Sequence, residues 1–341
     1  MNTDSIIVGR QTDRGIQLLR IVACVSVFVC HFAQRMNFQN FSQMLFDFSQ
    51  LTKYGVELFF VISGYLVCFS LAEGKSVIRF YKKRIIRILP LYYFCILYYY
   101  ITETFIFHDI PKDPYNLGWL RYIFCLNGIA PTDWNYFWSN LGITWTIPVF
   151  LLFYLLAPII VRIAKSVWIS ALILIGFIGL KFLINKTMPE YFTAFNYLPC
   201  FIFGVVVYKA KEENVRFLTA VGLLAFVIVF KWIDFGGALS GFLNDFVVSA
   251  IFAVMILFSE QFILHNRYCV KTFDVLDEYS YTLYLVHGIV FCGIIDKFEI
   301  NIFLRIVIAV FLTAVLTFSI HKFIEKPIQN YMNKMLLVKR K

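Results

Sequence analysis

The chain has few charged residues: Asp, Glu, Lys and Arg make up 15% of its 341 residues, whereas 60% are hydrophobic. A soluble globular protein carries about 25% charged residues, so a water-facing fold could not cover this much apolar surface. Disorder is excluded as well, because disordered segments are poor in hydrophobic residues. The net charge of +10 therefore does not indicate nucleic-acid binding, and the composition predicts a membrane protein with no nucleic-acid partner.

Paired cysteine motifs and internal repeats are also missing. None of the eight cysteines forms a CxxC pair and most lie inside apolar runs, so the sequence predicts neither a disulfide framework nor a metal site. Residues 1–17 are polar and lack the short apolar core of a cleavable signal. The two halves show no matching broken helices, which argues against a secondary transporter.

Long apolar runs are abundant instead, and a membrane-spanning helix needs about 20 such residues. The runs do not alternate with period two, which favours helices over the strands of a barrel. We therefore predict an all-α polytopic membrane protein with about ten transmembrane helices, with eight or eleven as alternative numbers. The predicted spans are 17–36, 53–72, 88–107, 142–161, 166–185, 192–209, 217–234, 245–264, 275–295 and 301–321.

The distribution of Lys and Arg predicts the orientation of these spans. With a cytoplasmic N-terminus, 22 of the 31 Lys and Arg residues fall on the inner side, as the positive-inside rule requires. Both termini are then cytoplasmic. The predicted organisation is a cytoplasmic N-terminal segment 1–16, a transmembrane domain 17–321 and a basic cytoplasmic tail 322–341. The sequence carries no signal for an oligomeric state.

Charged and titratable residues inside the spans are candidates for function, because they are costly in lipid. Arg20 and His31 are 11 residues apart, about three helical turns, so they share one face about 16 Å apart. Glu57 lies near the depth of His31 in the second span. We expect Glu57 to orient His31 as a general base. The alternatives are a histidine that only bonds a neighbouring helix, and a glutamate that reaches the outer interface.

A basic cluster precedes the third span, and Arg84 and Arg87 share one helical face in it. Guanidinium groups match the geometry of phosphate, which favours a phosphate-binding site. The alternative is an ordinary cytoplasmic flank in contact with anionic lipid.

Six motifs in order resemble the integral-membrane acyltransferase-3 family, whose members O-acylate surface carbohydrates. The resemblance extends over about residues 14–330. No single motif is specific, but six in register along ten predicted spans are. The motifs are the pair Arg20 and His31, 54–66 (YGVELFFVISGYL), 84–90 (RIIRILP), 198–204 (LPCFIFG), 280–287 (SYTLYLVH) and 324–327 (IEKP).

One motif departs from the family pattern. Residues 145–158 read WTIPVFLLFYLLAP, where the family usually has Ser at the second position and Glu at the sixth. Thr146 keeps the hydroxyl, but Phe150 replaces the carboxylate with a ring that can neither accept a hydrogen bond nor carry charge. The substitution puts in question the role of that carboxylate or the activity of this chain.

The resemblance implies acyl transfer, with acetyl as the expected group, from cytoplasmic acyl-CoA to a hydroxyl of a carbohydrate or glycolipid. The expected location is the bacterial cytoplasmic (inner) membrane, among membrane lipid. Acyl-CoA is then a donor substrate, and no permanently bound cofactor or metal is expected. His31 and Glu57 would be catalytic, and the phosphates would meet Arg20, Arg84 and Arg87. The residues expected to contact substrate are Trp145, Thr146, Tyr154 and His287.

Two other functions use the same residues. A transporter or flippase for a glycan or small anion would move its substrate without consuming acyl-CoA. A non-catalytic partner of polysaccharide assembly would tolerate His31→Ala, and the Phe150 substitution favours this alternative slightly.

Overall fold

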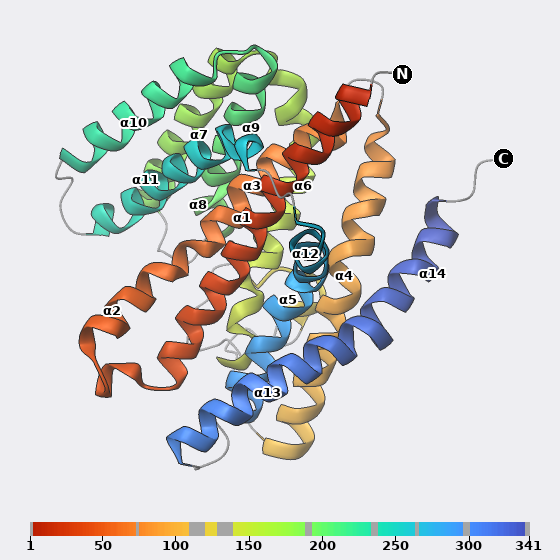
Figure 1. Ribbon diagram of the computed structural model, residues 1–341. Coiled ribbons are helices and arrows are strands. Elements are labelled where there is room, and N and C mark those ends of the chain that lie inside the picture. The colour runs from red at the N-terminus through yellow and green to blue at the C-terminus, as the bar shows by residue number, and fades with distance from the viewer. Residues whose placement is uncertain are drawn as a thin grey trace.

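The computed structural model describes residues 3–72, 75–108, 120–127, 139–187, 193–232, 238–262, 266–295 and 301–337. Every regular element within these ranges is a helix (Figure 1), which confirms the all-α class. Five helical stretches are long and apolar enough to cross a membrane: Arg14–Arg35, Gln43–Leu71, Val77–Ile106, Gly142–Ile163 and Ile302–Leu336. The ten spans and the cytoplasmic termini remain predictions.

The helices follow one another with short connections, and brief 3₁₀ or π-helical segments (η) link several of them. In chain order they are α1 (Thr3–Arg35), η1 (Phe38–Asn40), α2 (Gln43–Leu51), η2 (Thr52–Tyr54), α3 (Gly55–Leu71), α4 (Val77–Ile101), η3 (Thr102–Phe107), α5 (Leu120–Ile123), η5 (Ser139–Trp145), α6 (Thr146–Ile163), α7 (Val167–Thr187), α8 (Thr193–Asn196), α9 (Leu198–Glu212), α10 (Arg216–Trp232), α11 (Ala238–Leu257), η6 (Ser259–Gln261), α12 (Arg267–Gly288), η7 (Ile289–Ile294), α13 (Ile302–Ile320), η9 (His321–Glu325) and α14 (Lys326–Leu337).

Each predicted apolar run overlaps a helix, but several helices extend beyond the runs. α1 begins at Thr3, inside the predicted N-terminal segment, and α14 makes the predicted basic tail helical as far as Leu337. α4 begins at Val77, where the Ser76 hydroxyl accepts the Arg79 backbone N–H and caps the helix. Hydropathy misses these turns because they are amphipathic, with long basic side chains that need not enter lipid.

α3 and α9 pack with their backbones in direct contact. A Cβ added at Gly64 would collide with the carbonyl oxygen of Phe201, and one added at Gly204 would collide with that of Val61. Small residues allow such close approach, which is how membrane helices gain van der Waals contact without a hydrophobic driving force. Gly64 of the motif 54–66 and Gly204 of the motif 198–204 thus meet in the bundle and have a structural role.

Ion pairs join α1 to α12 at the end of the bundle where α1 begins. Arg14 pairs with Asp274, and Arg20 Nη2 lies 2.6 Å from Asp277 Oδ2. The hydrogen bond from Arg14 holds the pKa of the Asp274 carboxyl below its usual range. The two pairs fix the relative register of these helices.

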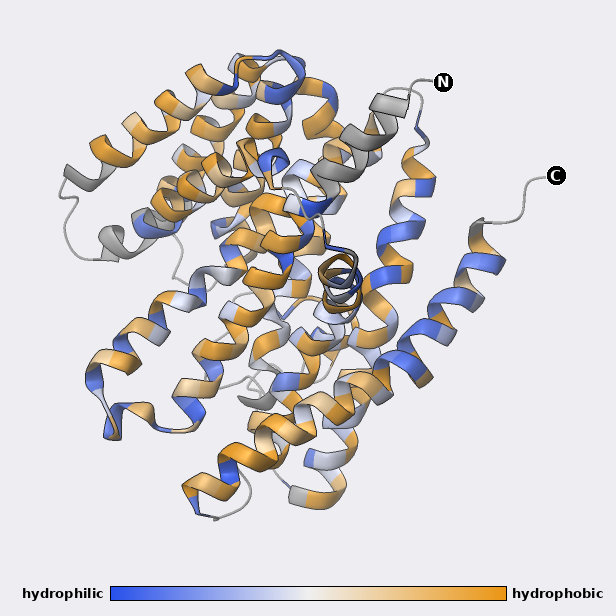
Figure 2. Cartoon of the chain, viewed as in Figure 1, coloured by the Kyte–Doolittle hydropathy of each residue, from blue (hydrophilic) through white to orange (hydrophobic). Residues whose placement is uncertain are grey.

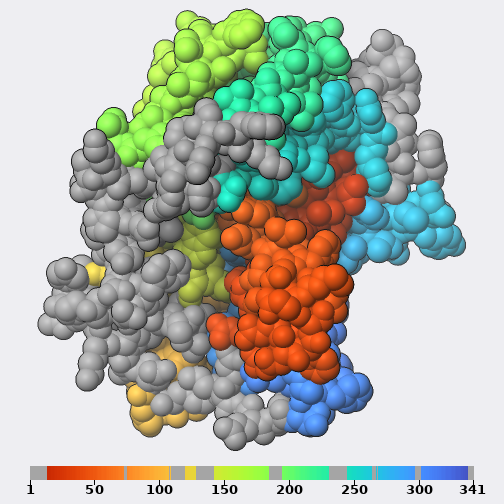
Figure 3. Space-filling view, turned by 90° about the vertical axis from the view of Figure 1, so that its left-hand side faces the viewer, coloured from red at the N-terminus to blue at the C-terminus, as the bar shows by residue number. Residues whose placement is uncertain are grey.

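The outside of the bundle is apolar, as expected for a membrane protein. Leu172, Ile175 and Leu183 on α7 are exposed, whereas Lys181 on the same helix is buried. Figure 2 shows hydrophobic residues along most of α10, with mixed character along α14. α2 lies on the outside of the bundle in the face shown in Figure 3.

Candidate active site

A narrow slot of about 110 Å³ runs between α1, α3, α4, α6 and α12. On α3 it is lined by the stripe Val56, Phe59, Ser63 and Leu66, which share one helical face because they are three or four residues apart. The rise of about 1.5 Å per residue makes this stripe about 15 Å long. The slot is mostly apolar, and Phe150 forms part of its wall.

A second, larger cavity of about 820 Å³ adjoins the slot. The two share Arg84 and Arg87 as lining residues, so these guanidinium groups stand at the boundary between them. Gln329 and Asn333 on α14 complete one wall of this cavity. We call the cavity the basic vestibule, because its lining includes Lys75, Arg79, Lys83, Arg84 and Arg87.

Arg84 is held in place between the vestibule and the slot. Its guanidinium lies 4.8 Å from the ring centre of Tyr154 and 5.3 Å from that of Phe80. It also donates to Ser70 Oγ over 3.3 Å. The aromatic contacts are cation–π interactions that orient the guanidinium without neutralising it, so its charge stays available to an anion.

Thr146 and Tyr284 close the far end of the slot. Their hydroxyl oxygens lie 3.1 Å apart and both residues line the slot. The ring of Tyr284 packs edge-on against the imidazole of His287, with centroids 5.7 Å apart. A bound molecule in the slot would therefore end beside this histidine.

His287 in turn stacks on His31, with ring centroids 5.4 Å apart and an angle of 21° between the planes. His287 Nδ1 lies 3.1 Å from the carbonyl oxygen of Leu283, which can only accept, so Nδ1 carries the proton. His287 Nε2 is then an acceptor; it is buried and has no hydrogen-bond partner among the described residues. The site thus places a buried proton acceptor next to the half-buried His31.

Glu57 lies on a different face of α3 from the slot. It is 5% exposed, and the charged groups that act on it are Asp245, Lys53 and Lys181. Its position follows from the sequence register, because Glu57 shares the stripe of Val61 and Gly64 that packs on α9. The expected pairing with His31 is therefore not what the described contacts show. Instead, His31 Nδ1 lies 3.1 Å from Gln34 Oε1.

The other predicted site residues divide into two groups. Arg20, Arg84, Arg87, Thr146 and Tyr154 all line the slot, although Arg20 does not line the vestibule and is paired with Asp277. Trp145 does not line the slot; its ring packs 5.0 Å from that of Tyr197.

Several residues of the site were not singled out by the sequence. Tyr284 belongs to the motif 280–287, but no spacing distinguishes it from its neighbours there. Lys75, Arg79 and Lys83 recur every four residues, in register with Arg87, which is a detectable signal of one basic face. Gln329 and Asn333 lie in a stretch that hydropathy assigns to a tail, so only the fold could reveal them.

Comparisons with known proteins show what the chain is similar to. The model of the family described as Acyltransferase domain (Acyl_transf_3) matches residues 13–322. "Putative acetyltransferase ORF330" of Acidianus two-tailed virus is 26% identical over 243 residues, which cover 68% of this chain and 71% of that relative. "Acyltransferase MdmB" of Streptomyces mycarofaciens is 34% identical over 76 residues, 22% of this chain and 20% of that relative. No solved structure matches the chain.

Proposed function

This chain belongs to the acyltransferase-3 family, and on that premise we propose that it is a membrane-bound O-acyltransferase. It moves an acyl group, with acetyl as the expected case, from cytoplasmic acyl-CoA to a hydroxyl of an envelope carbohydrate or glycolipid. The location proposed is the bacterial cytoplasmic membrane. The observation that carries the proposal is the continuity of the basic vestibule, the slot and the two histidines through Arg84, Arg87 and Tyr284.

The vestibule suits the nucleotide of the donor. Its five cationic side chains match the phosphates, and Arg84 and Arg87 offer forked N–H donors to phosphate oxygens. The slot suits the thin pantetheine arm, because it is small and mostly apolar and its wall on α3 is about 15 Å long. A donor bound in this way presents its thioester near Thr146 and Tyr284.

The chemistry then requires a base, because a hydroxyl is a poor nucleophile at neutral pH. His31 takes the proton of the acceptor hydroxyl while the oxygen attacks the thioester carbonyl carbon. The new C–O bond forms, the C–S bond breaks, and the departing CoA thiolate receives the proton. The Thr146 and Tyr284 hydroxyls bond each other, and Tyr284 also donates to the Ile143 carbonyl over 3.3 Å. We expect both to turn toward the thioester carbonyl oxygen as it gains charge.

The test uses purified full-length protein in lipid nanodiscs with acetyl-CoA and envelope glycan as acceptor. The proposal expects thiol release that depends on the acceptor, and a glycan that is heavier by one acyl group. Movement of glycan across a vesicle membrane without loss of thioester would instead identify a transporter. The same glycan mass in cells with and without the protein would contradict the proposal.

A further inference from the structure

A directed chain of hydrogen bonds runs from α2 to His31. Ser49 Oγ lies 2.6 Å from the carbonyl oxygen of Phe46, and Gln50 Nε2 lies 3.1 Å from Ser49 Oγ. Gln34 Nε2 lies 2.6 Å from Gln50 Oε1, and Gln34 Oε1 lies 3.1 Å from His31 Nδ1. Four hydrogen bonds thus link the backbone of α2 to the imidazole.

The chemistry of the atoms fixes the direction of every bond in this chain. The Phe46 carbonyl can only accept, so the Ser49 hydroxyl donates to it and its oxygen accepts from the Gln50 amide N–H. Gln50 then presents its amide oxygen, which accepts from the Gln34 N–H. Gln34 presents its own amide oxygen to His31 Nδ1, so Nδ1 must carry the proton. His31 Nε2 is left with its lone pair free.

The structure assigns Gln34 and Gln50 as positioning residues that hold His31 in the Nδ1-protonated form, with Nε2 as the base that receives the acceptor proton. The assignment rests on the proposed function only in taking His31 as the base. Gln34 and Gln50 thus have the orienting role that the sequence suggested for Glu57. Both remain neutral, so the imidazolium formed during the reaction is hydrogen-bonded to an amide and, among the described residues, not paired with a carboxylate.

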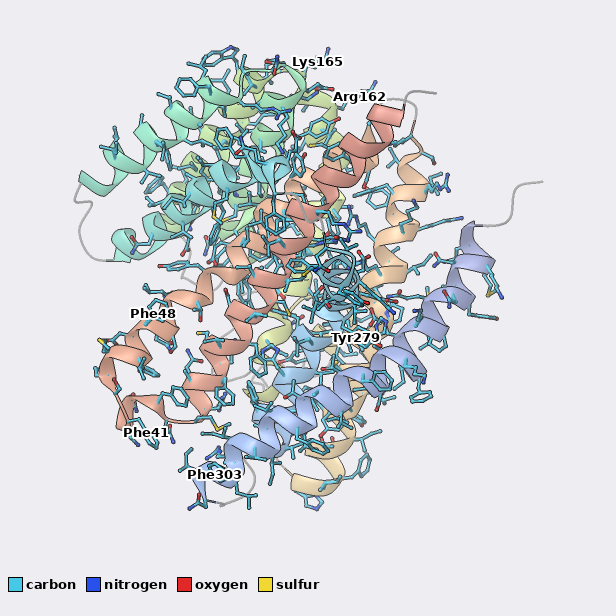
Figure 4. All side chains as sticks on the ribbon, in the orientation of Figure 1. Phe41, Phe48, Arg162, Lys165, Tyr279 and Phe303 are labelled. Carbon is cyan, nitrogen blue, oxygen red and sulfur yellow. The ribbon has the colours of Figure 1, made fainter. Side chains whose placement is uncertain are left out.

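α2 carries Gln50 at the edge of the bundle, whereas Gln34 lies near the end of α1. Met44, Leu45 and Phe48 are exposed on α2, whereas Ser49 is buried against the bundle. Figure 4 places Phe41 and Phe48 at the outer edge beside α2. Apolar side chains exposed on one face are what an amphipathic helix offers to lipid, and the other face of α2 presents Gln50 to Gln34.

The test compares Gln34→Met and Gln50→Met with the matched control Gln43→Met. Gln43 lies on α2 with Gln50, is exposed, and donates its amide N–H to Asp47 Oδ1 over 2.7 Å. Gln34→Met is expected to lower kcat about 10- to 100-fold with unchanged KM for acyl-CoA, by analogy with the loss seen when the hydrogen-bond partner of a metal-bound imidazole is removed. Gln50→Met should give a smaller loss in the same direction, and Gln43→Met none.

A conservative variant separates positioning from folding. Gln34→Glu keeps an acceptor for Nδ1–H, so kcat should stay well above that of Gln34→Met. Equal kcat for the wild type and Gln34→Met would overturn the assignment, as would equal losses in Gln34→Glu and Gln34→Met.

A second measurement does not need turnover. ¹⁵N-histidine spectra of the protein in nanodiscs at about pH 8, where an ordinary imidazole is neutral, report which ring nitrogen is protonated. Subtracting the spectrum of His31→Gln identifies the His31 signals. The chain of bonds is supported if His31 is Nδ1-protonated in the wild type and a mixture of the two tautomers in Gln34→Met. This result would stand even if no acyl transfer is found and the proposed function fails. An Nε2–H form in the wild type overturns the chain of bonds, even if the protein is an active acyltransferase.

Discussion

His31 on α1 and His287 on α12 stack with their ring centroids 5.4 Å apart. The ion pairs of Arg14 with Asp274 and of Arg20 with Asp277 hold the same two helices together nearer the start of α1. The spacing of Arg20 and His31 along α1 thus has a structural counterpart. The ion pair of Arg20 with Asp277 holds α1 against α12, and this packing brings the two rings together.

Replacing His31 tests the general base. His31→Ala should lower the acyl-transfer rate by about 10²- to 10⁴-fold, because general-base catalysis contributes about that much. The KM for acyl-CoA should not change, since the ring lines neither cavity. The measurement is acceptor-dependent thiol release. His108→Asn is the control, since His108 is exposed and its positive φ of 55° suits asparagine. Activity of His31→Ala equal to that of the control would exclude His31 as the base.

Replacing the arginines at the boundary tests the donor site. Arg84→Met and Arg87→Met should each raise the KM for acyl-CoA about tenfold or more, because a hydrogen bond to a charged group contributes about 1.5–3 kcal/mol. The difference in KM between each variant and the wild type should be smaller at high salt, because salt already weakens the binding of acyl-CoA to the wild type. Arg162→Met is the matched control, since this arginine on α6 lines neither cavity. An unchanged KM in both variants would show that acyl-CoA does not bind in the vestibule.

A double-mutant cycle can test whether the two hydroxyls at the end of the slot act on the same substrate atom. Tyr284→Phe and Thr146→Val each remove one of two hydroxyls that lie 3.1 Å apart. If both act on the same carbonyl oxygen, each change should lower kcat about tenfold or more, and the double variant should lose less than the product of the two. Wild-type kcat in both single variants would show that the pair only joins α6 to α12.

The close contact of α3 with α9 can be tested through stability. Gly64→Ala and Gly204→Ala should each destabilise the protein by about 1–3 kcal/mol or more, as overpacking does, because the added Cβ collides with a backbone carbonyl. The readout is the melting temperature in nanodiscs. Gly176→Ala and Gly179→Ala on α7 are the controls, because nothing lies within 4 Å of a Cβ added at either. Equal melting temperatures in the two sets would contradict this packing.

Periodicity and position could predict only part of the candidate site. The basic face at Arg84 and Arg87 and the polar residues Thr146 and Tyr154 were expected from their motifs, and all four line the slot. The pairing of Glu57 with His31 is not among the described contacts, because depth in the membrane says nothing about which face of a helix a residue occupies. Gln34 was missed although its spacing of three residues from His31 is a detectable signal. Glu57 and Val56 are adjacent in sequence, but one faces α9 and the other the slot, since successive residues turn by about 100°.

The sequence by itself determined that this is an all-helical membrane protein of the acyltransferase-3 family. A high apolar content requires that lipid surround the fold. The order of the motifs along the chain can be recognised without knowing how the helices pack. The tertiary structure alone decided which side chains of different helices meet: Gln34 with Gln50, His31 with His287, and Tyr284 with Thr146. These contacts depend on how each helix is rotated and on the register that ion pairs and glycine contacts set between helices distant in sequence. No periodic pattern along the chain encodes that long-range geometry.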